Sequence, residues 1–156
     1  MTIQYDILWK YVTQHFKANI YGIHGIKHWK NVERYGRRIA RQCGADEEIV
    51  RLFAIFHDAG RLSDGLDNEH GDRGADIASE LNGKLYDLND SRFDLLYFAC
   101  KYHSEGACAT DITVGACWDA DRLDLQRLDI EPDVKFLSTK AGHKMADKLM
   151  CAIRKR

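Results

Sequence analysis

The sequence predicts an all-α fold, and three observations predict it. Apolar residues recur with helical periodicity along most of the 156 residues, and strand-like alternation is nearly absent. Only one proline, Pro132, interrupts the pattern. No repeat, linker or low-complexity tract divides the chain. A chain of this length can bury a substantial core, so we expect residues 1–156 to form one domain.

Composition narrows the class of protein. The hydrophobic fraction of 45% and the charged fraction of 30% are typical of a soluble globular protein. The net charge of −1 gives no electrostatic reason to expect nucleic acid or a membrane as the main partner. The first residues lack the basic region and long apolar core typical of a signal peptide, and the five cysteines form no Cys-x-x-Cys pair. We therefore expect a cytoplasmic protein, whose oligomeric state the sequence does not determine.

Three helices are expected in the first half. The first covers residues 3–18, and its expected inner face comprises Ile3, Ile7, Leu8, Tyr11, Val12 and His15. The second covers residues 28–43 and ends at Gly44. The third runs from Asp46 to the pair His57-Asp58, and Gly60 is expected to end it in a left-handed conformation.

Four helices are expected in the second half. They cover about residues 70–81, 90–103 and 110–127, followed by a last helix that Ser138 can cap. In that last helix Ala141, Met145, Leu149 and Ile153 repeat every four residues.

The pair His57-Asp58 is the first candidate for chemistry. An apolar run, residues 52–56, delivers it to the end of a buried helix. Burying an imidazole and a carboxylate is unfavourable unless something binds them, and a divalent cation can bind both. The alternative is a helix-terminal histidine next to an aspartate turned to solvent.

Three further histidines strengthen the metal hypothesis. His28 opens the second predicted helix, His57 closes the third, His70 opens the fourth and His103 closes the fifth. In an antiparallel bundle these four ends lie on one side, as expected for a cluster of ligands. Asp121 lies at the edge of an apolar helical stripe and would also require a cation or a hydrogen-bond partner.

Residues 22–128 resemble the HD-domain metal-dependent phosphohydrolases. The similarity includes His28 with Val32 four residues later, His57-Asp58 followed by Ala-Gly-Arg, and Asp121 in an Ala-Asp-Arg-Leu context. The resemblance implies an HD-domain helical bundle in which His28, His57, Asp58 and Asp121 hold a divalent ion.

His70 and His103 extend the resemblance to the binuclear members. In these, two further histidines bind a second ion and the HD aspartate bridges both ions. The Gly-Tyr-Pro signature of the cyclic-dinucleotide branch is missing after His103, so that substrate is not implied. The expected cofactor is one or two divalent ions per chain; nitrogen and oxygen ligands suit Mn, Fe, Ni, Co or Mg, and Zn is compatible.

The expected activity is hydrolysis of a phosphate mono- or diester, with a nucleotide or another small phosphorylated metabolite as substrate. A metal-activated hydroxide would attack, Asp58 would bridge or orient, and Arg61 or Lys101 would steady phosphoryl oxygens. Weaker candidates for substrate contacts are His24, Arg73 and Arg122. The alternative interpretation is a solvated or salt-bridged surface charge for each of the four cations, Arg61, Lys101, Arg73 and Arg122, and a loop histidine without a role for His24.

Two rival functions remain open at this stage. A minority of HD proteins with the same ligand set use a mixed-valent di-iron centre to activate oxygen, and the ligands alone do not separate these from hydrolases. The other rival is a ligand-binding or regulatory module without turnover. The complete set of six ligand positions argues against such a module.

Overall fold

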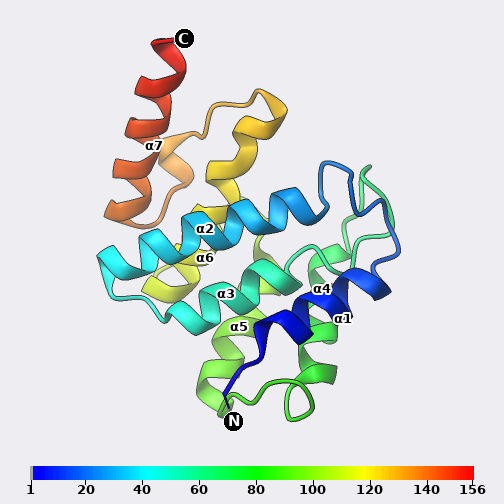
Figure 1. The fold of residues 1–156 in the computed structure, drawn as a ribbon. Helices are drawn as coiled ribbons and strands as arrows, with labels where there is room; N and C mark the ends of the chain where they lie inside the picture. The colour runs from blue at the N-terminus through cyan, green and yellow to red at the C-terminus, as the bar shows by residue number, and fades with distance from the viewer. Residues whose placement is uncertain (1) are drawn as a thin grey trace.

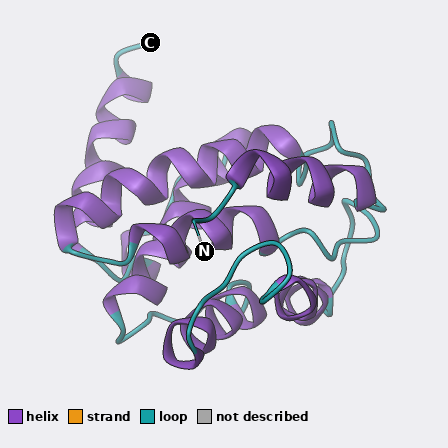
Figure 2. Ribbon diagram, turned by 60° about the horizontal axis from the view of Figure 1, so that its bottom comes forward, coloured by secondary structure: helices purple, strands orange, loops and turns teal. Residues whose placement is uncertain are grey.

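The computed structural model describes residues 2–156 and is all-α (Figures 1 and 2). Within that range the backbone forms seven α-helices, two short 3₁₀-helices and no strand. Their bounds are α1 (Tyr5–His15), α2 (Ile26–Cys43), α3 (Glu47–Phe56), α4 (His70–Leu81), α5 (Asp90–Tyr102), α6 (Ile112–Leu123), η1 (Asp124–Leu128), η2 (Val134–Phe136) and α7 (Lys140–Arg154). The expectation of an all-α fold is confirmed.

Local sequence sets the boundaries around α3. Gly44 ends α2 in the left-handed conformation, with φ of 77°, and its N–H donates to the carbonyl of Ala40. Two residues later the carboxylate of Asp46 accepts hydrogen bonds from the backbone N–H groups of Glu48 and Ile49, and so caps α3. The chain therefore reverses between α2 and α3 within three residues.

Helix α3 is the centre of the bundle. All its residues from Ile49 to Phe56 are buried except Arg51. Helices α2, α5 and α6 all contact α3, and α2 also packs on α6 (Figure 1). A Cβ added to Gly36 of α2 would lie 2.4 Å from Cγ1 of Val50, so glycine allows α2 to approach α3 closely. The burial of α3 accounts for its continuous apolar sequence.

Helix α4 is brought onto the end of α3 by glycines. A Cβ on Gly74 would lie 2.4 Å from the carbonyl oxygen of Phe56 in α3. A Cβ on Gly71 would lie 2.5 Å from the carbonyl oxygen of Lys101, so α4 also lies close to α5. Gly60 has an ordinary negative φ, so the expected left-handed helix end is wrong. Glycine is required at position 60 because a Cβ there would lie 2.5 Å from Cβ of Arg73.

Three further expectations are corrected. In α1, Ile7, Tyr11 and His15 are exposed, and Trp9 is buried instead, stacked on Trp29 with ring centroids 6.2 Å apart. The helix expected over 110–127 is α-helical only to Leu123 and continues as η1. The cap of α7 is the hydroxyl of Thr139, because the Ser138 hydroxyl accepts a hydrogen bond from Ala109 N–H.

The C-terminal part of α7 extends from the rest of the molecule (Figures 1 and 2). Its first half packs on α6 through small and flexible residues, Ala141, Gly142, Met145 and Ala146, whereas residues 151–156 are exposed. No helix within residues 2–156 has the length and apolar character needed to cross a bilayer.

The close approach at Gly74 predicts that Gly74→Ala destabilises the protein. The added methyl group must displace the Phe56 and His57 carbonyls, and overpacking of this kind costs about 1–3 kcal/mol. Thermal unfolding should show a fall in Tm of about 3–10 °C. Gly65→Ala is the control, because the added Cβ would meet only Ser63 Oγ at 3.6 Å. Equal Tm values for the two variants would contradict this explanation of α4 docking.

Candidate metal centre

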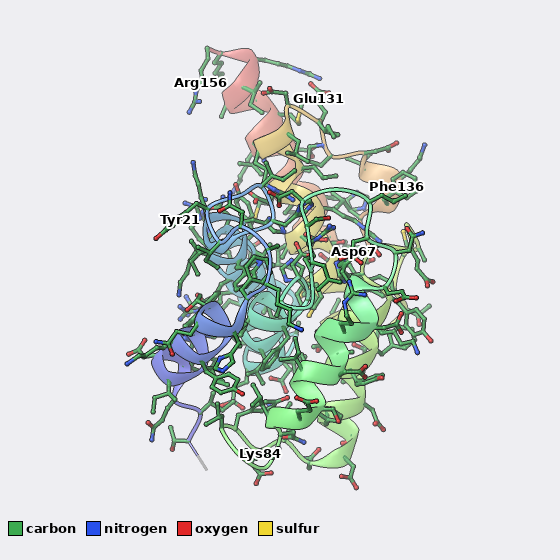
Figure 3. The ribbon with its side chains drawn as sticks, turned by 90° about the vertical axis from the view of Figure 1, so that its right-hand side faces the viewer. Tyr21, Asp67, Lys84, Glu131, Phe136 and Arg156 are labelled. Atoms are coloured by element: carbon green, nitrogen blue, oxygen red, sulfur yellow. The ribbon has the colours of Figure 1, made fainter. Side chains whose placement is uncertain are left out.

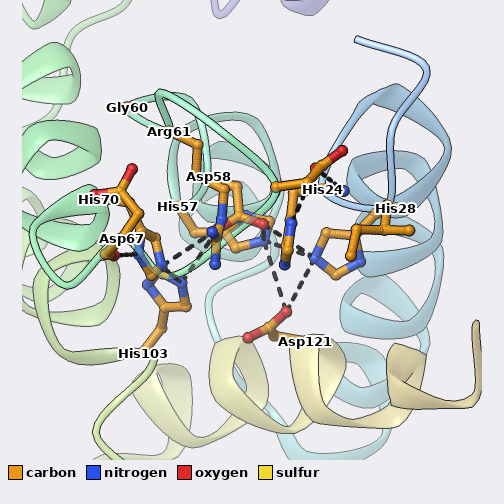
Figure 4. Close-up of polar contacts among 12 residues, drawn as sticks. His24, His28, His57, Asp58, Gly60, Arg61, Asp67, His70, His103 and Asp121 are labelled. Carbon is orange, nitrogen blue, oxygen red and sulfur yellow. Dashed lines mark hydrogen bonds and ion pairs between the residues drawn. The ribbon is translucent and has the colours of Figure 1, made fainter. Parts of the chain in front are cut away.

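Four buried imidazoles meet at one end of the bundle (Figure 4). His28 lies in the first turn of α2, His57 follows α3, His70 begins α4 and His103 follows α5. Their Nε2 atoms form two close pairs: His28 and His57 are 3.1 Å apart, and His70 and His103 are 3.0 Å apart. The alternation of helix starts and ends in the sequence therefore does bring the four side chains together.

The outer nitrogen of each imidazole is held by an acceptor. The Nδ1 atoms donate to an oxygen of Asp124 (from His28, 2.7 Å), Phe53 (from His57, 3.1 Å), Asp67 (from His70, 2.5 Å) and Cys100 (from His103, 2.7 Å). Three of these acceptors are backbone carbonyls, which cannot donate, so the proton must be on Nδ1. In a neutral imidazole the Nε2 atom then carries a lone pair, and all four lone pairs converge.

The Asp58 carboxylate lies between the two imidazole pairs (Figure 4). Its Oδ2 is 3.4 Å from His28 Nε2 and 3.6 Å from His57 Nε2. Its Oδ1 is 3.5 Å from both His70 Nε2 and His103 Nε2. Each oxygen of this buried side chain thus serves a different pair of histidines.

These side chains fit a metal ion. Two groups have ligand atoms within 4.8 Å of one another, His28-His57-Asp58 and Asp58-His70-His103, and they share Asp58. The Nε2–Nε2 distances match the edge of about 3.0 Å between ligands placed about 2.1 Å from one octahedral ion. Facing lone pairs repel unless a cation separates them, so the donor arrangement favours positive charge at both positions.

Asp121 adds a second carboxylate to the first group. Its Oδ1 is 3.1 Å from His28 Nε2 and 3.7 Å from His57 Nε2, whereas it makes no ion pair with the His70-His103 group. The first group therefore offers four ligand atoms and the second offers three. Both consist of nitrogen and oxygen donors, which suit first-row divalent metals and Mg²⁺.

The pKa values reflect crowding of carboxylates around the imidazoles. Burial alone would lower the pKa of His28, but hydrogen bonds to Asp121, Asp124 and Asp58 outweigh it and raise the pKa to about 10. Burial lowers the pKa of His57 to about 3. Burial would raise the pKa of Asp58, but His57, His103 and His28 hold it well below its usual range. The raised pKa of His28 and the lowered pKa of Asp58 both reflect opposite charges in close contact at this site, where the carboxylates supply negative charge that a bound cation would compensate.

A third carboxylate, Asp124, orients His28 from behind. Asp124 is buried, its Oδ2 accepts from His28 Nδ1, and its Oδ1 accepts from Asn31 Nδ2 at 2.9 Å. Arg127 Nη1 lies 3.7 Å from the same carboxylate. An acceptor on the outer nitrogen fixes the tautomer and ring orientation of a metal-binding histidine and increases its basicity.

The site opens into a pocket of about 410 Å³. Asp58, His70, His103 and Asp121 line one side of it. Three guanidinium groups line it too, those of Arg61, Arg122 and Arg127. Arg61 also donates from Nε to Asp58 Oδ1 at 3.1 Å, so this cation touches the shared carboxylate directly.

The other sequence-predicted residues are placed differently. His24 lines the pocket, and its Nδ1 lies 3.1 Å from Asp64 Oδ1. Lys101 lies outside the pocket and pairs with Asp72 at 3.3 Å. Arg73 is also outside it: the side chain binds the Gly60 carbonyl, Asp67 and Glu69, and so holds the loop before α4. Neither Lys101 nor Arg73 lines the pocket, and their expected contacts with a substrate stay a prediction.

Sequence reasoning missed two residues of this region. Asp124 orients His28 and Arg127 lines the pocket, although both lie just after Asp121. The change from α6 to η1 at Asp124 alters the direction of the side chains, and a regular helical wheel does not show it. The signal that could have found Asp124 is the run of aspartates at 119, 121 and 124, of which the sequence analysis assigns only Asp121 to the site.

Comparison with known proteins agrees with this geometry. The family model described as HD domain matches residues 25–131. A solved structure of a predicted HD superfamily hydrolase from an uncultured Thermotogales bacterium superimposes with a TM-score of 0.78 and 25% sequence identity. That alignment covers 96% of this chain and 87% of the other chain. A search of curated proteins gave no match. Because this family model matches more than half of the chain, the chain belongs to the HD domain family.

Proposed function

We propose that this protein is a metal-dependent phosphohydrolase that cleaves a phosphate mono- or diester. The observation that supports it most is the Asp58 carboxylate, whose two oxygens face two separate pairs of imidazole nitrogens beside a pocket with three guanidinium groups. The HD domain match and the likeness to a predicted hydrolase support the same reaction class.

One divalent ion would be held by His28, His57, Asp58 and Asp121, and a second by Asp58, His70 and His103. Such ions lower the pKa of a bound water and neutralise negative charge on a phosphoryl group. The donors are compatible with Mn, Fe, Ni, Co or Mg. Asp58 would be the ligand common to both ions, and its loss would affect both.

The substrate phosphoryl group would be oriented by the guanidinium groups. Planar guanidinium groups bind phosphoryl oxygens through charge-assisted hydrogen bonds, often two at a time. Arg61 is the best placed, because it lies in the pocket and contacts Asp58. Arg127 would contact phosphoryl oxygens, which is the role that the sequence suggested for Lys101. A pocket lined by three guanidinium groups favours an anionic substrate, which distinguishes it from a pocket that would suit an uncharged oxygenase substrate.

Replacing Asp58 tests the shared-ligand proposal. Asp58→Ala or Asp58→Asn should lose both bound metal and phosphate-ester hydrolysis, each by more than about 100-fold. Elemental analysis of the purified variant and a panel of phosphate esters measure the two effects. Asp72→Asn is the control, since Asp72 pairs with Lys101 outside the pocket. An active Asp58→Ala protein would overturn the proposal, as would oxygen consumption by an iron-loaded protein that hydrolyses no ester.

Paired substitutions of Arg61 and Lys101 test the anion contacts. Arg61→Met should lower kcat/KM about 10- to 100-fold, the loss expected for a hydrogen bond to a charged group. Lys101→Met should change kcat/KM less than about twofold, because Lys101 lies outside the pocket. Steady-state kinetics at saturating metal provide the comparison. The reverse order of effects would restore the assignment suggested by sequence.

Substitution of Asp124 tests whether this carboxylate orients His28 for metal binding. Asp124→Asn keeps an acceptor for His28 but removes the negative charge, so metal affinity should fall about 10- to 100-fold. Equilibrium dialysis against Mn²⁺ measures this affinity. Asp129→Asn is a suitable control, because Asp129 is exposed and asparagine tolerates its left-handed conformation, with φ of 57°. Equal affinities for both variants would show that Asp124 does not act through His28.

A further inference from the structure

The pocket beside the metal centre has a second, apolar half. Beyond the ligands and guanidinium groups, its lining includes four large apolar side chains, Leu125, Leu128, Ile130 and Phe136. Leu125 and Leu128 belong to η1, and Phe136 belongs to η2. A volume of about 410 Å³ is in the range of pockets that enclose a whole small organic molecule. The pocket therefore has more room and more apolar surface than a bare phosphate requires.

This apolar wall is exposed although the chain has a large core elsewhere. Ile130 is 49% exposed and Phe136 is 40% exposed, and both lie at the same pocket. In Figure 3, Phe136 lies above the loop that carries Asp67, on the same side of the molecule. Large apolar side chains grouped around a cavity favour an apolar ligand over water.

The wall is also held in place before any ligand binds. Asp129 ends η1 in the left-handed conformation, and its N–H donates to the carbonyls of Gln126 and Leu125. Leu137, next to Phe136, is buried in the core. Arg122 Nη1 donates to the carbonyl of Phe136. A preformed apolar surface can bind a ligand without the entropic cost of ordering a loop.

Arg122 joins the metal-binding half of the pocket to its apolar half. The residue is only 9% exposed and lines the pocket next to Asp121. Within residues 2–156 its Nη2 atom has no hydrogen-bond partner. That nitrogen is enclosed by protein and exposes almost no surface to the pocket, and the guanidinium carbon lies 5.5 Å from the centroid of the Trp118 ring. Arg122 therefore acts through its positive charge, which lies beside Asp121 and the Phe136 carbonyl and favours the anionic end of a ligand there.

Negative charge at the outer rim of the pocket limits the charge that a ligand's apolar group can have. Glu131 and Asp133 both belong to the pocket lining and are exposed. Asp133 is paired with Lys135 at 3.0 Å, whereas Glu131 makes no ion pair within the described residues. Negative charge at this end disfavours a second anionic group there. The group on the apolar wall is therefore neutral or cationic.

We propose that the substrate is a phosphate ester of a bulky apolar alcohol, whose ring or chain packs on Leu125, Leu128, Ile130 and Phe136. This inference rests on the proposed hydrolase function. In the reaction, the oxygen of water bonds to phosphorus and the bond between phosphorus and the alcohol oxygen breaks. One proton of the water goes to the departing alcohol and the other stays with the phosphate. Arg122 lines the pocket and binds the Phe136 carbonyl, so it adds positive charge where the phosphoryl and apolar parts of the ester meet.

Two esters with similar leaving oxygens test this specificity. The metal-loaded protein should hydrolyse 2-phenylethyl phosphate with a kcat/KM at least about tenfold above that for 2-hydroxyethyl phosphate. Phe136→Ala should reduce this ratio to less than about threefold. Val134→Ala is the matched control, because Val134 is exposed on the same 3₁₀ turn but does not line the pocket. The control should keep the wild-type ratio.

A binding measurement separates failure of the inference from failure of the proposed function. 2-Phenylethylphosphonate and 2-hydroxyethylphosphonate cannot be hydrolysed, and calorimetry gives their affinities directly. Hydrolysis of both esters at equal kcat/KM, or an unchanged ratio in Phe136→Ala, would overturn the apolar subsite and leave the hydrolase. No hydrolysis of either ester would count against the proposed function. Equal affinity of the wild-type protein for the two phosphonates would then overturn the subsite as well.

Discussion

The arrangement around Asp58 is the constraint on which the rest of this structure depends. A carboxylate that is only 2% exposed, at the end of an apolar helix, is unfavourable without positive charge nearby. Arg61 supplies a permanent cation on Oδ1, and four imidazoles surround the two oxygens. Each imidazole is turned so that its proton points outward, which leaves lone pairs facing inward. The site is thus electrostatically incomplete in a way that one or two divalent ions would complete.

The helical framework brings the four imidazoles and Asp58 together. Two helix starts and two helix ends meet at one end of the bundle, and the buried helix α3 fixes the position of His57 and Asp58. Gly60 and Gly74 let α4 lie against the end of α3, which brings His70 close to His103. The outer nitrogens donate mainly to backbone carbonyls, so the fold itself sets the tautomers. Packing and site chemistry are therefore coupled through a small number of backbone contacts.

Much of the fold and of the ligand cluster follows from the sequence, and the reasons are specific. His28, His57, His70 and His103 occur at alternating helix ends, and this local signal survives errors of a few residues in the boundaries. The role of Asp124 does not follow, because it depends on η1 replacing the last turn of the expected helix. Lys101 lies only two residues before His103 in the sequence, which suggests a place in the pocket. Its side chain instead pairs with Asp72. Contacts between distant segments, such as Arg122 with the Phe136 carbonyl, have no local signature.

The claim that Asp58 joins two metal sites is tested most directly by electron paramagnetic resonance of the Mn²⁺-loaded protein. Two ions sharing a carboxylate lie about 3.5–4 Å apart and are magnetically coupled. We expect two Mn²⁺ per chain with a coupled spectrum, which His70→Ala should convert to the six-line spectrum of a single ion. Two uncoupled ions per chain, or one ion that His70→Ala leaves unchanged, would contradict the shared-ligand arrangement.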